Sequence, residues 1–146
     1  MRQFVMAAML FSPLLVQAQN AHEIYARQLV ERQARAWETH NFALAKPDWL
    51  PAAVLTSPDG PTPAPAIGKA MDDYFKDFSD LKVVIKNLIV SPDGNKLALE
   101  WDWSIVRKRD GYHGISHDAI LVDLKNGKIA SWREYFDPAA SGEAKP

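Results

Sequence analysis

The last third of this chain closes on Asn126-Gly127-Lys128-Ile129-Ala130-Ser131-Trp132-Arg133-Glu134-Tyr135-Phe136-Asp137. An Asn-Gly pair between apolar segments is a strong signal for a hairpin turn, so a strand is expected directly after it. Three more β-rich segments precede this one, separated by turn residues such as Ser91-Pro92-Asp93-Gly94. The predicted strands are Leu81–Val90, Lys96–Lys108, Tyr112–Leu124 and Lys128–Asp137. Such short connections favour an antiparallel meander.

Two amphipathic helices are predicted ahead of these strands. The first runs from Ala21 to Thr39 with Asn20 as its N-cap, because apolar residues recur at helical spacing and only Gln33 interrupts them. The second covers Ile67–Phe78 and has one unbroken apolar stripe. The segment Ser57–Pro65 carries four prolines and is predicted to be a loop. Helices first and strands afterwards indicate the α+β class.

The composition of the 146 residues supports a single domain and excludes several functions. There is no cysteine, so a disulfide, a thiolate metal site and a thiol nucleophile are all excluded. The formal net charge is −1 and basic residues alternate with acidic ones, which argues against nucleic-acid binding.

The first eighteen residues have the pattern of a removable secretory signal. Arg2 gives a positive start, residues 4–16 are almost entirely apolar, and Val16-Gln17-Ala18 resembles a cleavage site. The apolar run is shorter than the ~20 residues that span a bilayer. The alternative is an uncleaved helix. We therefore expect a signal peptide at 1–18, one domain at 19–140 and a flexible tail at 141–146. The mature protein is then periplasmic or secreted, without a membrane anchor.

The closing strand begins at a Gly-Lys-Ile turn and ends in Arg, Tyr and Asp, and two helices precede the strands. This arrangement resembles the SnoaL-like domains of the nuclear transport factor 2-like superfamily, over about residues 24–137. The resemblance implies a cone-shaped α+β barrel, in which N-terminal helices pack in a strongly curved antiparallel sheet. A pocket is then expected at the open end. Ketosteroid isomerases, polyketide cyclases and limonene epoxide hydrolases share this fold.

Asp118 is the leading candidate for an acid in that pocket. The apolar face of the strand at 112–124 consists of Ile120, Val122 and Leu124. Asp118 lies two residues before Ile120, so its side chain points to the same face, just outside the apolar run. It is therefore either a pocket acid or the buried partner of Arg133. By the resemblance, it also lies near the place where steroid isomerases carry an aspartate that donates to the reacting oxyanion. A carboxyl group kept protonated by an apolar site can fill that role.

Other candidates follow from the resemblance and from the strand pattern. SnoaL-like cyclases use a late aspartate as acid or base, which adds Asp137, with a turn at Pro138 as the structural alternative. Arg133 and Tyr135 would tune or orient Asp118. The candidate ligand contacts are Gln33, Trp37, Tyr74, Trp101, Trp103 and His117.

Two polar residues of the strands have competing interpretations. Asp102 shares the polar phase of its strand and is expected outside, although limonene epoxide hydrolases hold a pocket carboxylate on a comparable strand. His117 is either a surface residue or a base at the pocket rim. His113 and His117 are four residues apart, which on a strand is ~13 Å and too far for one shared zinc ion. No metal and no cofactor is expected.

The sequence departs from the steroid isomerases at their catalytic base. They carry an aspartate just before a proline, whereas this chain has Thr56-Ser57-Pro58, and a serine cannot abstract a proton unaided. Steroid isomerisation is therefore not expected. The predicted function is an exported pocket protein for a small hydrophobic or carbonyl-bearing molecule. Whether it catalyses an isomerase, cyclase or hydrolase step stays open.

The alternative function is a non-catalytic dimeric module for ligand binding or protein interaction. A homodimer is expected through the outer face of the sheet. The reason is that Trp101, Trp103 and Trp132 place more aromatic surface on the strands than one small core readily holds.

Overall fold

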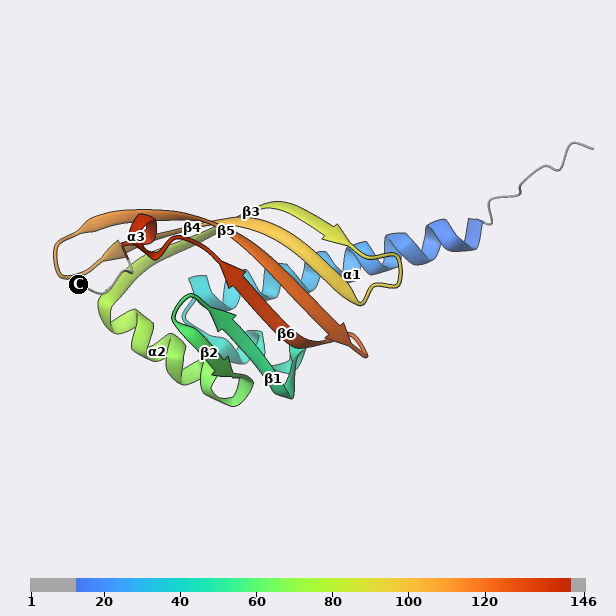
Figure 1. The fold of residues 1–146 in the computed structure, drawn as a ribbon, viewed down its shortest axis with the longest axis horizontal. Helices are drawn as coiled ribbons and strands as arrows, with labels where there is room; N and C mark the ends of the chain where they lie inside the picture. Colours follow the sequence, from blue (N-terminus) through green and yellow to red (C-terminus); the bar gives the residue numbers. More distant parts are fainter. Residues whose placement is uncertain (1–12, 143–146) are drawn as a thin grey trace, which may run out of the picture.

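The computed structural model describes residues 13–142 of the chain (Figure 1). Its helices are α1 (Pro13–Glu38), α2 (Ile67–Asp77) and α3 (Pro138–Ser141), with 3-10 turns at Phe42–Leu44, Lys46–Asp48 and Ala64–Ala66. Its strands are β1 (Trp49–Ser57), β2 (Gly60–Pro63), β3 (Phe78–Val90), β4 (Lys96–Arg107), β5 (Tyr112–Lys125) and β6 (Lys128–Tyr135). The two predicted helices correspond to α1 and α2, and the four predicted strands match β3–β6 within three residues at each end.

The strands form one sheet in the order β2-β1-β6-β5-β4-β3. The neighbours are antiparallel except β1 and β6, which run parallel with Leu55 opposite Trp132. The sheet is thus mixed, whereas the sequence predicted a purely antiparallel one. The reason is that β2 forms inside the segment Ser57–Pro65, which was predicted to be a loop, and that β1 at Trp49–Ser57 extends well beyond the brief strand that Val54–Thr56 indicated. The connection from β1 to β6 contains α2 and four strands, which is long enough for parallel neighbours.

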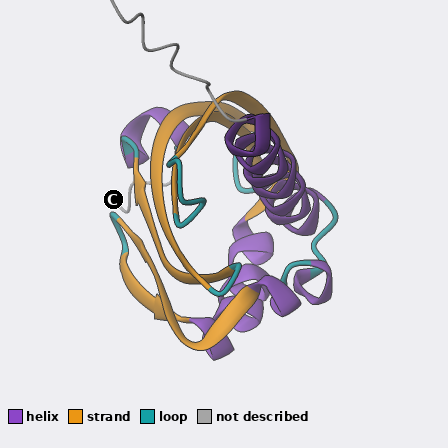
Figure 2. Ribbon diagram, turned by 90° about the vertical axis from the view of Figure 1, so that its right-hand side faces the viewer, coloured by secondary structure: helices purple, strands orange, loops and turns teal. Residues whose placement is uncertain are grey.

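The sheet is strongly curved, as the α+β prediction required. Asp80 has a φ of +53°, and the pairing of β3 with β4 is irregular between Ser79 and Lys82 and again between Ile85 and Asn87. Such bulges bend a strand and increase its twist. Figure 2 shows the result, with α1 lying along the concave side of the curled sheet. The predicted cone-shaped arrangement of helices in a curved sheet is confirmed.

Helix α1 is longer than predicted. It begins at Pro13, so Asn20 lies inside it and is not its N-cap. The predicted apolar stripe faces the sheet: Leu29 and Val30 are fully buried. Residues 1–12 of the predicted signal peptide lie outside the described residues, and α1 continues without a break past Ala18.

The large aromatic residues of the sheet lie inside the protein. Trp101 and Trp132 are 1% and 2% exposed, and their ring centroids are 5.6 Å apart. Trp103 packs on Trp101 from the other side, with centroids at 5.9 Å. Their indole N–H groups are not left unpaired, because each donates to a polar side chain. The aromatic argument for a dimer is therefore wrong, since one core holds all three rings.

The chain after β6 is more ordered than predicted. Asp137 caps the one-turn helix α3, and Ser141 is fully buried. A Cβ atom at Gly114 would meet the carbonyl oxygen of Ser141 at 1.9 Å, so only glycine allows this close approach to β5. Arg107 Nη1 also donates to the carbonyl oxygen of Gly142 at 2.9 Å. The helix α3 thus extends past residue 140, where the tail was expected to begin, and residues 143–146 lie outside the described residues.

Candidate functional site

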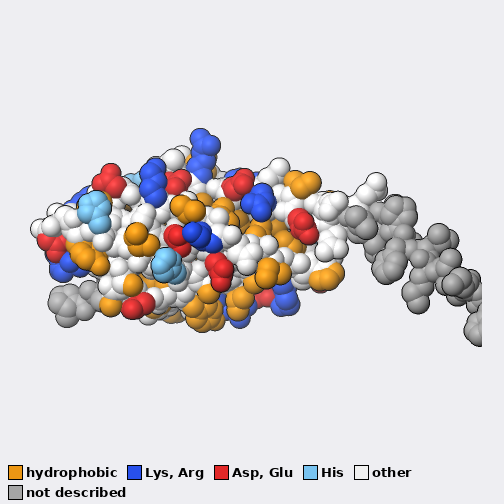
Figure 3. Space-filling model, turned by 90° about the horizontal axis from the view of Figure 1, so that it is seen from above, with side chains coloured by type: hydrophobic (Ala, Val, Ile, Leu, Met, Phe, Trp, Pro, Cys, Tyr) orange, Lys and Arg blue, Asp and Glu red, His pale blue; other side chains and the backbone are white. Residues whose placement is uncertain are grey.

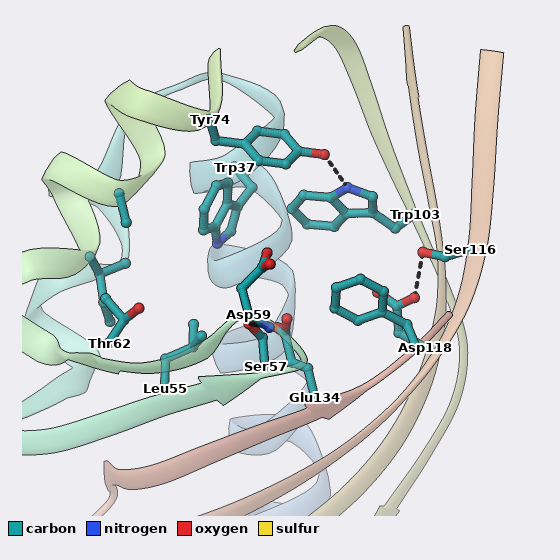
Figure 4. Close-up of a pocket in the computed structure, with 13 residues that line it drawn as sticks. Trp37, Leu55, Ser57, Asp59, Thr62, Tyr74, Trp103, Ser116, Asp118 and Glu134 are labelled. Atoms are coloured by element: carbon teal, nitrogen blue, oxygen red, sulfur yellow. Dashed lines mark hydrogen bonds between the residues drawn. The ribbon is translucent and has the colours of Figure 1, made fainter. Parts of the chain in front are cut away.

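A cavity of about 190 Å³ lies between α2, the end of α1 and the inner face of the sheet (Figure 4). The β1–β2 hairpin forms its lower rim, and α2 and α1 form the opposite side. Strands β4, β5 and β6 supply the remaining wall. This is the position at which the resemblance to SnoaL-like domains implied a pocket. The residues around it fall into an acidic group and an aromatic group.

Asp118 is the buried acid of this cavity. It is 4% exposed, and its two carboxyl oxygens accept hydrogen bonds from Ser116 Oγ at 2.6 Å and from Trp101 Nε1 at 2.9 Å. Burial raises the pKa of Asp118 above its ordinary value, although the hydrogen bonds from Ser116 and Trp101 oppose this. No lysine or arginine within residues 13–142 forms an ion pair with it. Asp118 is thus an acid in the pocket and not half of a buried ion pair.

The hydroxyl of Ser116 can keep a hydrogen bond to Asp118 in both protonation states of the carboxyl group. A hydroxyl group can donate to a carboxylate, and it can rotate to accept from a carboxylic acid. The indole of Trp101 is a donor only, so it always faces the oxygen that lacks the proton. When Asp118 is protonated, its proton therefore belongs on the oxygen next to Ser116, and both residues line the cavity.

Glu134 brings a second carboxyl group to the same cavity. It lies opposite Ile120 in the pairing of β5 with β6, so it is diagonal to Asp118 on the inner face. Its Oε1 accepts a hydrogen bond from Trp132 Nε1 at 2.6 Å. Two carboxyl groups on neighbouring strands therefore face one small space.

Three aromatic rings form the opposite corner of the cavity. Trp37, Tyr74 and Trp103 come from α1, α2 and β4, and their centroids lie 5.3 to 6.0 Å apart. The planes of the rings cross at 70° to 83°. Trp103 Nε1 donates to Tyr74 Oη at 2.9 Å, which fixes both rings. The prediction that these three residues contact a ligand remains untested, but all three line the cavity.

The rim of the cavity comes from the β1–β2 hairpin, which the sequence identified only as a turn. Ser57, Asp59 and Thr62 line the cavity from this side. Gly60 has a φ of +112°, which the turn requires and which favours glycine. Ser57 stands where the resemblance to steroid isomerases placed their catalytic base, and its hydroxyl accepts from the backbone N–H of Asp59 at 3.2 Å. It is therefore part of the turn.

Two of the predicted ligand contacts support the site from behind instead of lining it. Trp101 is buried beneath the cavity wall and donates to Asp118. Gln33 is 3% exposed, but its amide donates to Asp48 Oδ2 at 3.0 Å and accepts from Trp49 Nε1 at 2.9 Å. Arg32 also donates to both carboxyl oxygens of Asp48. Gln33 thus ties α1 to the start of β1 and lies outside the cavity lining.

The structure places Arg133, Tyr135 and Asp137 away from Asp118. Arg133 lies on the outer face of β6, where its Nη2 pairs with Asp123 Oδ2 at 3.0 Å. Tyr135 shares this face and is 55% exposed. Asp137 is exposed and accepts the backbone N–H of Ala139 at 2.9 Å, which is the structural alternative of a turn at the end of the strand. Strand alternation explains the outward positions of Arg133 and Tyr135, because Trp132 and Glu134 take the inner face of β6.

His117 and Asp102 face each other on the outer surface of the sheet. His117 Nδ1 and Asp102 Oδ1 are 2.7 Å apart, and Lys86 Nζ lies 3.2 Å from the other oxygen of Asp102. Hydrogen bonds from His117 and then from Lys86 lower the pKa of Asp102. Neither residue reaches the cavity. The interpretation of Asp102 as an outward-facing residue agrees with the structure, and so does a surface position for His117.

Within residues 13–142, no group of three or more acidic or histidine side chains gathers in a way that would hold a metal ion. In the same part of the chain, no helix is long and apolar enough to cross a bilayer.

Comparison with known proteins identifies the class of this protein. A family model described as a SnoaL-like domain matches residues 30–132, which is more than half of the chain. The protein therefore belongs to the SnoaL-like family, as the resemblance in its sequence implied. A search of curated proteins gave no match.

Solved structures with the same fold include three bacterial proteins. One is a protein with a ketosteroid isomerase-like fold from Catenulispora acidiphila in complex with trimethylamine, at 17% identity and a TM-score of 0.70, covering 81% of this chain and 97% of that one. IdmH from Streptomyces antibioticus, "a putative polyketide cyclase", has 11% identity, a TM-score of 0.68, and coverage of 79% and 94%. AclR from Streptomyces galilaeus, "a putative hydroxylase", has 16% identity, a TM-score of 0.67, and coverage of 84% and 78%. At these identities the likeness shows the fold alone.

Proposed function

We propose that this protein binds a small carbonyl-bearing molecule in the cavity and catalyses acid/base chemistry on it, with Asp118 as the proton donor. The observation that carries the proposal is the pairing of a buried, raised-pKa carboxyl group with a second carboxyl group in one cavity. Pairs of titratable groups in different environments are how enzymes separate an acid from a base. IdmH, which shares this fold, is described as "a putative polyketide cyclase", and a cyclisation of that kind would use the same class of chemistry.

The proposed step is an enolisation. Asp118 gives its proton to the carbonyl oxygen of the ligand while the Glu134 carboxylate takes a proton from the neighbouring carbon. The C–H electron pair becomes the new C=C bond, and the carbonyl π pair becomes the O–H bond. Return of a proton to another carbon completes an isomerisation, whereas attack of the enol carbon on an electrophile completes a cyclisation. Both carboxyl groups are needed, because the acid must be protonated while the base is ionised.

The experiment is deuterium exchange into a small cyclic enone, cyclohex-2-enone, in D₂O, followed by NMR. We expect saturable binding, seen as a change in tryptophan fluorescence, and deuterium exchange at the saturated carbon next to the carbonyl, C6, faster than with an equal concentration of acetate. Glu134→Gln is expected to bind the enone but to lose the exchange. Binding without any exchange by the native protein would support the non-catalytic alternative. No binding would contradict the proposal.

We also propose that the protein is exported and loses residues 1–18, so that the mature chain begins at Gln19. The charged start, the short apolar run and the Val16-Gln17-Ala18 pattern support this. Intact mass of the protein from the exported fraction tests it, and a species that retains Met1 would contradict it.

We also propose a homodimer through the outer face of the sheet, because large apolar side chains are exposed on this face. Val84, Ile115 and Tyr135 are each more than half exposed on this face, and Leu121 is 40% exposed. Figure 3 shows hydrophobic side chains scattered among charged ones over the surface formed by β3, β4 and β5. We expect a dimer by sedimentation at micromolar concentration and a monomer for Ile115→Asp. Ile24→Asp, an equally exposed position on α1, is the control. A monomeric native protein would contradict the expectation.

A further inference from the structure

The charges around the cavity are all of one sign. Of the described residues that line it, three are acidic, namely Asp59, Asp118 and Glu134, and none is lysine, arginine or histidine. An anionic ligand would therefore meet no opposite charge there. Because aromatic rings also line the cavity, we propose that the ligand carries an organic ammonium group, which lies between the Asp59 carboxylate and the corner formed by Trp37, Tyr74 and Trp103. This inference rests on the proposed function, since it gives a chemical class to the molecule that the cavity binds.

The aromatic corner has the geometry that attracts an organic cation. The planes of the three rings are nearly perpendicular to one another, at 83°, 70° and 74°. All three residues line the cavity, so a small group bound there lies close to more than one ring. The faces of indole and phenol rings attract cations, and the attraction is strongest for tryptophan and in desolvated sites. Two of the three rings here are tryptophan.

Asp59 supplies a negative charge that no protein group neutralises. Its side chain has no hydrogen-bond or ion-pair partner within residues 13–142, whereas other exposed aspartates such as Asp73 and Asp110 are paired. Figure 4 shows it pointing from the β1–β2 turn toward the space between Trp37 and Trp103. An acid placed at the mouth of an aromatic cavity would attract a cation and hold it against the rings.

A bare metal ion does not fit this arrangement as well as an ammonium group does. Asp59 comes from the β1–β2 hairpin, whereas Asp118 and Glu134 come from the sheet, and the three do not gather as a set of metal ligands within the described part of the chain. Aromatic rings do not replace the oxygen ligands that Ca²⁺ and Mg²⁺ require. An alkylated ammonium ion needs no such ligands and presents an apolar surface to the rings.

The test compares choline with 3,3-dimethylbutan-1-ol, its neutral isostere, in which carbon replaces the charged nitrogen. Binding is followed by calorimetry and by tryptophan fluorescence at constant ionic strength. We expect choline to bind about tenfold more tightly than the alcohol, as is typical of a desolvated cation–π site. Equal affinities, or no saturable binding of choline, would overturn the inference.

Two matched variants locate the charge. The quartet Ser-Pro-Asp-Gly occurs at 57–60 and again at 91–94, and only the first lines the cavity. Asp59→Asn is expected to weaken choline binding about fivefold and to leave the neutral alcohol unchanged. Asp93→Asn, in the second turn, is expected to change neither. Equal effects of the two substitutions would overturn the assigned position. If the enone of the previous section binds and choline does not, the inference fails while the proposed function stands; if neither binds, both fail.

Discussion

Asp118→Asn is expected to lower the catalysed exchange by about 100-fold or more while leaving the fold intact. The loss follows because the amide cannot donate a proton, and removing one donor to a developing oxyanion typically costs 10²–10³ in rate. The fold survives because asparagine has nearly the same shape. Its oxygen can accept from Trp101 Nε1 and its NH₂ group can donate to Ser116 Oγ.

The same substitution has a defined effect on stability. The pKa of Asp118 is raised by folding, so the folded state holds its proton more tightly than the unfolded state. Stability therefore falls as pH rises from the unfolded value near ~3.9 to the folded pKa. Asp118→Asn removes this loss. At neutral pH the variant is then expected to unfold at the same temperature as the native protein or a higher one, with a flatter stability profile above pH 4.

Asp123→Asn is the matched control, because folding lowers the pKa of Asp123, whereas it raises the pKa of Asp118. Hydrogen bonds from Lys96 and Ser131, with the charge of Arg133, lower the pKa of Asp123. Its ionised form therefore stabilises the fold above the unfolded pKa, and this stability is lost as pH falls toward the folded pKa. Thermal unfolding between about pH 2 and pH 8 covers the range in which both groups titrate and measures both variants. A fall of many degrees in the midpoint of Asp118→Asn at pH 7 would make Asp118 a structural residue.

Trp101→Ala is expected to destabilise the protein by about 3–5 kcal/mol, the usual cost of removing a large aromatic side chain from a core. Trp101 is 1% exposed and lies between Trp103 and Trp132 at centroid distances of 5.9 and 5.6 Å. Urea unfolding measures the change. A loss below about 1 kcal/mol, as for a surface substitution, would contradict the packing described here.

Trp101→Phe separates the packing from the hydrogen bond. It keeps a ring in the core but removes the N–H donor, so the pKa of Asp118 is expected to rise further. Trp49→Phe is the control, because Trp49 is also buried and its N–H group donates to Gln33 instead. Only the first substitution should move the pH dependence assigned to Asp118.

Strand alternation predicted the acid of this site but not its surroundings. Three apolar residues after Asp118 fixed its phase, and it is buried on the inner face as expected. The prediction that Arg133 would tune it was wrong, because Arg133 lies on the outer face of β6 and pairs with Asp123. Trp132 already marked the inner phase, and the same alternation carried forward two residues would have found Glu134.

Other parts of the site had no readable signal. Asp59 and Thr62 belong to a hairpin inside a segment with four prolines, and prolines argue against a strand unless it lies at an edge. β2 is in fact the edge of the sheet. Gln33 interrupts an apolar stripe, which is what a ligand contact would do, but its partners Asp48 and Trp49 come from a region without periodicity. Long-range partners of this kind are set by tertiary packing.

The most direct test of the account is an NMR titration of the Asp118 carboxyl carbon in the ¹³C-labelled protein. We expect a midpoint above the ordinary aspartate value of ~3.9, and a still higher midpoint in Ser116→Ala, which removes one of the two hydrogen bonds that oppose the shift. A midpoint at or below ~3.9 would mean that Asp118 is an anion throughout the working range, and would contradict its role as the proton donor of this cavity.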